Sequence, residues 1–232
     1  MPDITARATR FSAKVLEAYA RHTLPEGLTV RASTDAAPAE ILLYDEIGFW
    51  GVTAKDFALA LTDAGAGPLR VRINSPGGDV FDGLAIHNAL KARGNVEVVV
   101  DGLAASAASF IAMAGSKITM ASNAFLMIHN AWGVVAGNRH DLAETEKVLA
   151  KIDGQLAGIY AARSGKPVEE MAAAMDGETW FTSSEAKAAG LVDHVEGMEP
   201  ASTPENKGGG GLKAAAPEIE RRRRLARWAS AA

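Results

Sequence analysis

The chain has 232 residues, which suits one large domain with appendages rather than two full domains. It is 48% hydrophobic and 22% charged, close to an average soluble globular protein, so it can bury a sizeable core. Its formal net charge of −4 gives no strong basic field, and we therefore expect no nucleic-acid partner. The chain contains no cysteine, which excludes disulfide scaffolds, cysteine-ligated zinc and a thiol nucleophile.

No apolar run approaches the length of a membrane span, and the first 27 residues lack the continuous apolar region of a secretory signal. We therefore expect no membrane partner and a cytoplasmic location.

The chain divides by composition into an N-terminal segment (1–39), a body (40–197) and a C-terminal tail (198–232). In the N-terminal segment, residues 11–22 could form a short helix. The expected strands of the body are 41–47, 69–73, 96–100, 117–120, 125–128 and 191–195. The expected helices are 53–63 capped by Thr53, 80–93, 106–114, 141–163, a short helix starting at Pro167, and another capped by Ser183 or Ser184. Alternating strands and helices predict an α/β fold with crossover connections.

The longest expected helix, 141–163, begins with the spacing of a capping box at Asp141 and Glu144. One helical stripe follows, made of Val148, Leu149, Ile152, Leu156, Ile159 and Tyr160. The tail carries proline, serine, a four-glycine run and a basic stretch at 221–224. This composition is typical of a flexible linker, so we expect the body to fold without it.

The segment 73–79, with sequence INSPGGD, lies between an expected strand and an expected helix. Two adjacent glycines, Gly77 and Gly78, let the backbone approach a ligand closely and expose its N–H groups. Half of an oxyanion hole is one interpretation, and an ordinary Pro-Gly turn is the other.

The segment 101–109, with sequence DGLAASAAS, directly follows a buried-strand candidate. Ser106 would lie near the start of a helix, where free N–H groups and the helix dipole favour developing negative charge. Ser109 is the rival serine, one turn further along. The alternative interpretation is that this run of Ala and Ser only lets a helix pack closely.

Three further residues complete the candidate chemistry. His129, at the end of a short strand in MIHN, could reach a serine on a neighbouring element, whereas the other four histidines compete poorly. Asp176 and Glu178 both qualify as the carboxylate that orients a catalytic histidine. No spacing argument chooses between these two carboxylates.

Five motifs in this order, INSPGG, GLAASAA, MIH, IYAARSGKP and SSEAKAAGLVDHV, resemble the Clp protease proteolytic subunit family over about residues 41–195. Their details resemble the phage and prophage branch, whose members resemble head-maturation proteases. The resemblance implies the ClpP/crotonase-like spiral of β-β-α units, with helix 141–163 as the handle that joins rings face to face.

The resemblance also assigns roles to residues. Ser106 matches the family's nucleophile, His129 its general base, and Gly78 and Ala107 its two oxyanion-hole donors.

The third member of the triad matches less closely. The family pattern has its aspartate where this chain has Ala174, so Asp176 is the expected member after a shift of two residues.

The implied function is that of a serine endopeptidase with a Ser-His-Asp triad, acting as a head-maturation protease on scaffold or capsid protein. There are two alternatives. One is a housekeeping Clp peptidase that works with an ATP-dependent unfoldase, and the other is a non-catalytic head-assembly protein.

We expect a homo-oligomeric ring that can stack on another ring. Any AAA+ unfoldase must be a separate chain, because the sequence has no nucleotide-binding loop. No metal and no cofactor are expected. A signal peptide peptidase with a Ser-Lys dyad and a crotonase-like enzyme fit less well, because MIH supplies the protease histidine.

Overall fold

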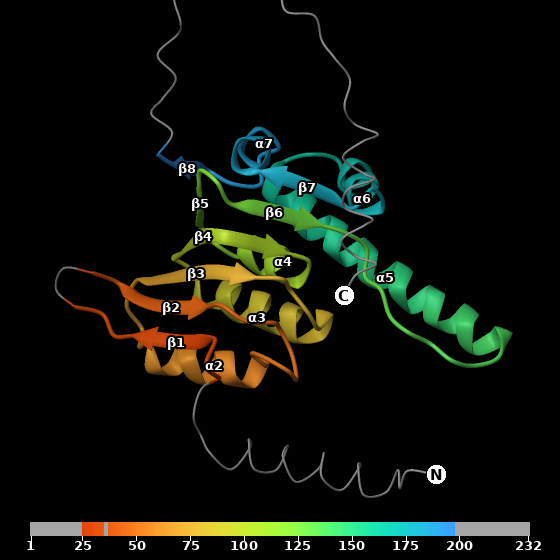
Figure 1. Cartoon of the computed structure of the whole chain (residues 1–232), viewed down its shortest axis with the longest axis horizontal. Coiled ribbons are helices and arrows are strands. Elements are labelled where there is room, and N and C mark those ends of the chain that lie inside the picture. The colour runs from red at the N-terminus through yellow and green to blue at the C-terminus, as the bar shows by residue number, and fades with distance from the viewer. Residues whose placement is uncertain (1–24, 35–36, 198–232) are drawn as a thin grey trace, which may run out of the picture. The chain divides into compact units, whose positions relative to one another are not determined.

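The computed structural model describes residues 25–34 and 37–197 (Figure 1). The described residues all belong to one compact unit within Met1–Met198. The expected helix at 11–22 and the tail at 198–232 lie outside the described residues.

A mixed sheet of eight strands runs through the described body (Figure 1). Its main path follows the order β1-β2-β3-β4-β5-β8, with β6 paired to β4 and β7 paired to β6. Neighbouring strands are parallel along the path β2-β3-β4-β5-β8. Strand β1 pairs antiparallel with β2, and β7 pairs antiparallel with β6. The strands are β1 Leu28–Arg31, β2 Ala39–Leu43, β3 Leu69–Ser75, β4 Val96–Ala105, β5 Lys117–Ala121, β6 Phe125–Ile128, β7 Thr179–Thr182 and β8 His194–Glu196.

Six helices accompany these strands in the described residues, and the mixed α/β architecture with one long helix confirms the predicted fold class. They are α2 Ala54–Asp63, α3 Val80–Arg93, α4 Ala107–Ala112, α5 Arg139–Ser164, α6 Val168–Asp176 and α7 Ser183–Ala188. Thr53 caps α2 as predicted, through a capping box with Asp56. Asp79 caps α3 by accepting hydrogen bonds from Phe81 and Asp82.

Strand β4 is the longest strand and changes partner along its length. Its first half, Glu97 to Val100, pairs with β5, and its last residues, Leu103 to Ala105, pair with β6. Since β6 also runs parallel to β4, the carboxyl ends of β3, β4 and β6 meet at one edge of the sheet. Ligands of open α/β sheets bind outside such carboxyl ends.

The alternation along β3 explains how the sheet is covered. Leu69, Val71 and Ile73 are buried in the hydrophobic core that the helices share. Arg70 and Arg72 point to the other face, where they form ion pairs with carboxylates of β4.

Several details of the sequence prediction were wrong. The expected strands 41–47, 96–100 and 191–195 are observed as Ala39–Leu43, Val96–Ala105 and His194–Glu196. Helix α5 begins at Arg139 and is capped by Asn138, and Asp141 is the third helical residue, which completes the capping box, rather than the cap. Thr182, not Ser183 or Ser184, caps α7, because its hydroxyl accepts the Glu185 N–H. Strands β1 and β7 were not predicted, since each has only four residues and gains its pairing from a distant neighbour.

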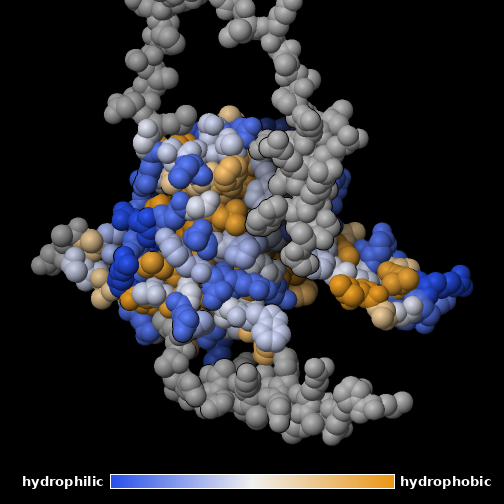
Figure 2. Space-filling view, viewed as in Figure 1, coloured by the Kyte–Doolittle hydropathy of each residue, from blue (hydrophilic) through white to orange (hydrophobic). Residues whose placement is uncertain are grey.

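Helix α5 has two halves with different surroundings. Ile152, Leu156 and Tyr160 in its second half are buried in the core. The first half projects from the body (Figure 1), and Val148, predicted to continue the apolar stripe, is 51% exposed. Figure 2 shows apolar surface on this projecting arm. The apolar residues exposed on α5 and the segment before it are Trp132, Val134, Val135, Leu142 and Val148.

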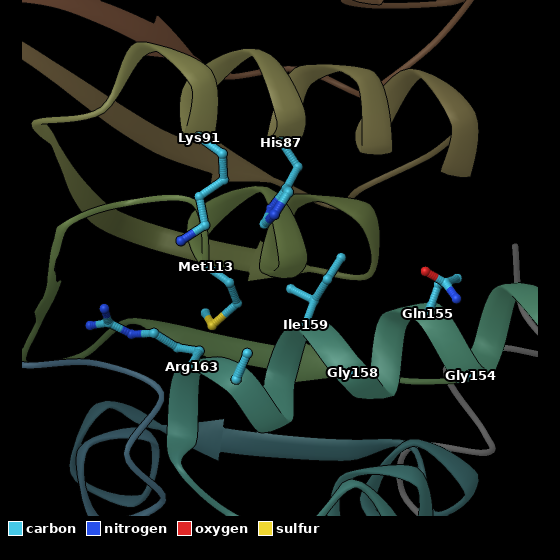
Figure 3. Close-up of a pocket in the computed structure, with 9 residues that line it drawn as sticks. His87, Lys91, Met113, Gly154, Gln155, Gly158, Ile159 and Arg163 are labelled. Atoms are coloured by element: carbon cyan, nitrogen blue, oxygen red, sulfur yellow. The ribbon is translucent and has the colours of Figure 1, made fainter.

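A cavity of about 430 Å³ lies between α3, the end of α4 and α5 (Figure 3). None of the residues that line it is among the predicted site residues. His87 on its wall is 5% exposed and donates from Nδ1 to the carbonyl of Phe110, 2.7 Å away. Burial lowers the pKa of His87, and the nearby Lys91 charge lowers it further, against the opposing effect of the Phe110 bond.

This buried histidine predicts a loss of stability in acid. The unfolded chain binds a proton on His87 near pH 6.5, where the folded protein still holds the neutral ring. The stabilisation is complete above that pH and is lost as the pH falls below it. We expect His87→Asn, which keeps a donor for Phe110, to flatten the dependence of the free energy of unfolding on pH between about 7.5 and 5. Urea unfolding at several pH values measures this, and equal slopes for the two proteins would contradict it.

Candidate active site

The predicted site residues follow three neighbouring strands. Gly77 and Gly78 come after β3, Ser106 directly after β4, and His129 directly after β6. Because β3 and β6 both run parallel to β4, these residues gather at one sheet edge. The sheet topology therefore brings together segments that are far apart in the sequence.

Ser106 has an unusual backbone conformation. Its φ of 52° and ψ of −124° lie in a region that few residues other than glycine adopt, at a cost of about 1–3 kcal/mol. The Ser106 N–H donates to the carbonyl of Met127 on β6, at 3.0 Å. Ala105 and Ala107 on either side are buried and small. The turn from strand to helix thus presents the Ser106 hydroxyl at the sheet edge.

The hydroxyl of Ser106 meets the imidazole of His129. The distance from Ser106 Oγ to His129 Nε2 is 2.7 Å, a normal hydrogen-bond length. The rival serine, Ser109, is fully buried, and its hydroxyl donates to the Ser106 carbonyl and bonds the hydroxyl of Tyr160. Of the two serines, only Ser106 lies against a base.

The segment Gly77–Asp79 after β3 is hydrogen-bonded to the backbone of Ile47. The Ile47 N–H donates to the Gly77 carbonyl and the Ile47 carbonyl accepts from Asp79, at 2.7 and 2.9 Å. Ile47 and Gly78 form an isolated parallel bridge whose two hydrogen bonds use the groups on either side of Gly78, so the Gly78 N–H points away from Ile47. This arrangement needs glycine: φ is 93° at Gly77 and 145° at Gly78.

Gly77 also lies directly against the serine turn. A Cβ atom at this position would come within 2.7 Å of both Ala107 N and Ser106 Cβ. Within residues 25–34 and 37–197, neither the Gly78 N–H nor the Ala107 N–H donates to a protein group. Two unused N–H groups beside the hydroxyl are what an oxyanion hole requires.

The two candidate carboxylates, Asp176 and Glu178, lie just before β7, the neighbour of β6. Strand β7 pairs antiparallel with β6, with Thr179 opposite Ile128, so the loop before β7 passes next to the end of β6. Asp176 accepts a hydrogen bond from the side-chain amide of Asn130, at 2.7 Å. Glu178 accepts one from the indole of Trp180, at 3.3 Å. The hydrogen bond that His129 makes within the described residues is the one to Ser106, so the structure brings Asp176 to the neighbour of His129 and not to its ring.

Three residues of this region were missed from the sequence. Asn130 holds Asp176, Asp153 on α5 accepts from the Ala131 N–H at 2.7 Å, and Tyr160 bonds Ser109. Asn130 adjoins His129 in the MIHN motif, which could have marked it. Nothing in the pattern of α5 distinguishes Asp153 from a solvated charge or Tyr160 from a core residue.

In the part of the chain that the structure describes, no three His, Asp or Glu side chains lie together as metal ligands would. No described helix combines the length and the apolar character needed to cross a membrane.

The sequence profile named Clp protease matches residues 52–199. The chain is 35% identical over 128 residues to an ATP-dependent Clp protease proteolytic subunit of Pleurastrum terricola, covering 54% of this chain and 65% of that protein. It is 37% identical over 126 residues to proteolytic subunit 3 of Rhodococcus jostii, covering 53% and 62%. It is 31% identical over 166 residues to the subunit of Porphyromonas gingivalis, covering 66% and 75%. The match thus spans less than two thirds of the first two relatives, and most of the third. By its sequence and its α/β fold, the chain belongs to the Clp protease family.

Proposed function

We propose that this protein is a serine endopeptidase in which Ser106 is the nucleophile and His129 the general base. The observation that carries the proposal is the 2.7 Å hydrogen bond between Ser106 Oγ and His129 Nε2, next to two unused backbone N–H groups.

The mechanism is acyl transfer to serine. Neutral His129 takes the hydroxyl proton while Ser106 Oγ attacks the peptide carbonyl carbon. The N–H groups of Gly78 and Ala107 stabilise the negative charge on the carbonyl oxygen. Protonated His129 then gives its proton to the leaving amine, and an acyl-enzyme remains. Water, deprotonated by His129, hydrolyses that ester and restores the hydroxyl.

The substrates that we propose are polypeptides, and the names of the relatives favour the housekeeping alternative over head maturation. The three relatives described above are called ATP-dependent, which is consistent with a separate unfoldase that supplies unfolded chains. Processing of scaffold or capsid protein stays a second candidate that rests on the details of the sequence motifs alone. Degradation of a folded substrate that requires an added ATPase would favour the first.

We further propose that the protein assembles into rings and that the projecting half of α5 takes part in their contact. Apolar side chains at a protein surface, grouped on one arm, are typical of an interaction site. Leu142 and Val148 are 49% and 51% exposed on this arm, and Val134 just before it is 92% exposed. A second copy of this chain is the partner that family membership suggests.

Replacing Ser106 by alanine should abolish peptide hydrolysis, by at least about a thousandfold, and leave the fold unchanged. The hydroxyl contributes chemistry and little packing. Labelling the wild type with a fluorophosphonate and mapping the modified peptide identifies the nucleophile directly. A label on Ser109 instead of Ser106 would disprove the assignment.

Asp176 should contribute to the orientation of His129 more than Glu178 does. Its carboxylate lies on Asn130, next to the base, whereas Glu178 bonds Trp180. We expect Asp176→Asn to lower kcat by about tenfold or more and Glu178→Gln to change it less than about twofold. Mild effects of both substitutions would mean that the site works as a Ser-His pair.

Placing a charge on the arm should weaken assembly. Val148→Lys puts an ammonium group into the proposed apolar contact, and we expect the largest species in sedimentation velocity to dissociate. Ala143→Lys makes the same change of charge on another exposed face of α5 and serves as the control. Equal assembly of both variants would rule out this contact.

A further inference from the structure

We propose that Tyr160 of α5 is a positioning residue, which acts through Ser109 and the Ser106 carbonyl to aim the Ala107 N–H at the oxyanion. The inference rests on the proposed function and adds two residues to the machinery of the same site. Neither residue touches the reacting atoms.

The hydrogen bonds run in one direction. A carbonyl oxygen only accepts hydrogen bonds, so the Ser109 hydroxyl must donate its single proton to the Ser106 carbonyl, 2.6 Å away. The Tyr160 hydroxyl, 2.7 Å from Ser109 Oγ, must therefore donate to it. Burial raises the pKa of Tyr160, which keeps this proton in place at neutral pH.

The planarity of the peptide bond carries the effect to the oxyanion hole. The carbonyl of Ser106 and the N–H of Ala107 belong to one trans peptide unit, so they point in opposite directions. The Ser109 N–H, at 2.9 Å, and the Ser109 hydroxyl hold the carbonyl on one side. The Ala107 N–H is thereby fixed toward the other side, where the Gly77–Gly78 turn lies.

Fixing the orientation of the Ser106–Ala107 peptide unit matters because the Ser106 backbone is strained. At φ 52° the residue would relax toward an ordinary conformation if its peptide unit could rotate. Ser109 is fully buried and Tyr160 is 1% exposed, so water is not available to replace either hydroxyl. An oxyanion donor must be aimed before the reaction starts to be effective.

The test is Tyr160→Phe, which removes the hydroxyl and keeps the ring. We expect kcat per active site, counted by fluorophosphonate titration, to fall about tenfold, with KM within about twofold of the wild type. A peptide aldehyde, whose adduct carries the oxyanion, should lose affinity by a similar factor. Ser109→Ala should give the same pattern, and the double variant should be no worse than Ser109→Ala alone, because the two residues act in series.

Two controls remove comparable hydroxyl groups elsewhere. Ser164→Ala removes a bond to the Tyr160 carbonyl on the same helix, and Tyr44→Phe removes a tyrosine hydroxyl bonded to Asp101. Both should keep kcat and aldehyde affinity within about twofold.

The outcomes separate this inference from the proposed function. A wild type that hydrolyses no peptide and takes no label on Ser106 would contradict the proposed function. An active wild type with undiminished kcat and aldehyde affinity in Tyr160→Phe would contradict the positioning role alone. If Tyr160→Phe does not fold, Ser109→Ala carries the same expectation, and unchanged values there overturn it equally.

Discussion

The end of strand β4 constrains the rest of the site. Strand β4 pairs with β3 and β5 and then with β6, and the residue directly after it is Ser106, whose φ is 52°. That backbone would relax if it were not held on both sides. The Met127 carbonyl holds the Ser106 N–H, and Ser109 holds the Ser106 carbonyl. The strain is therefore supported by β6 and α4, the elements that bracket the reacting hydroxyl.

The two halves of the long helix α5 make different contacts. Its second half packs in the core and sends Tyr160 to Ser109 and Asp153 to the backbone just after His129. Its first half leaves the body and exposes apolar side chains. If copies of the chain meet on that arm, a single rigid helix connects the assembly contact to both the nucleophile turn and the segment that follows the base.

Much of this arrangement could be predicted from the sequence, for physical reasons. Strong local signals identified α3 with its bounds and the Thr53 cap of α2, whereas the small residues around Ser106 left a nucleophile turn and close helix packing both open. Strand β7 could not be predicted, because four residues become a strand only by pairing with β6.

The candidate carboxylate Asp176 shows the same limit. The position of the Asp176 carboxylate depends on how the pairing of β6 with β7 places the loop before β7. The hydrogen bond from Asn130 to Asp176 is a tertiary contact that has no signature in the sequence. The family resemblance pointed to Ser106 and His129, whose side chains the structure joins by a hydrogen bond. It did not point to Tyr160, which the sequence shows only as one more position of a helical stripe.

The most direct measurement is a crystal structure of the fluorophosphonate adduct. We expect phosphorus on Ser106 Oγ and one phosphoryl oxygen about 2.7–3.1 Å from both Gly78 N and Ala107 N. An adduct on another residue, or a phosphoryl oxygen bonded to neither N–H group, would contradict this expectation.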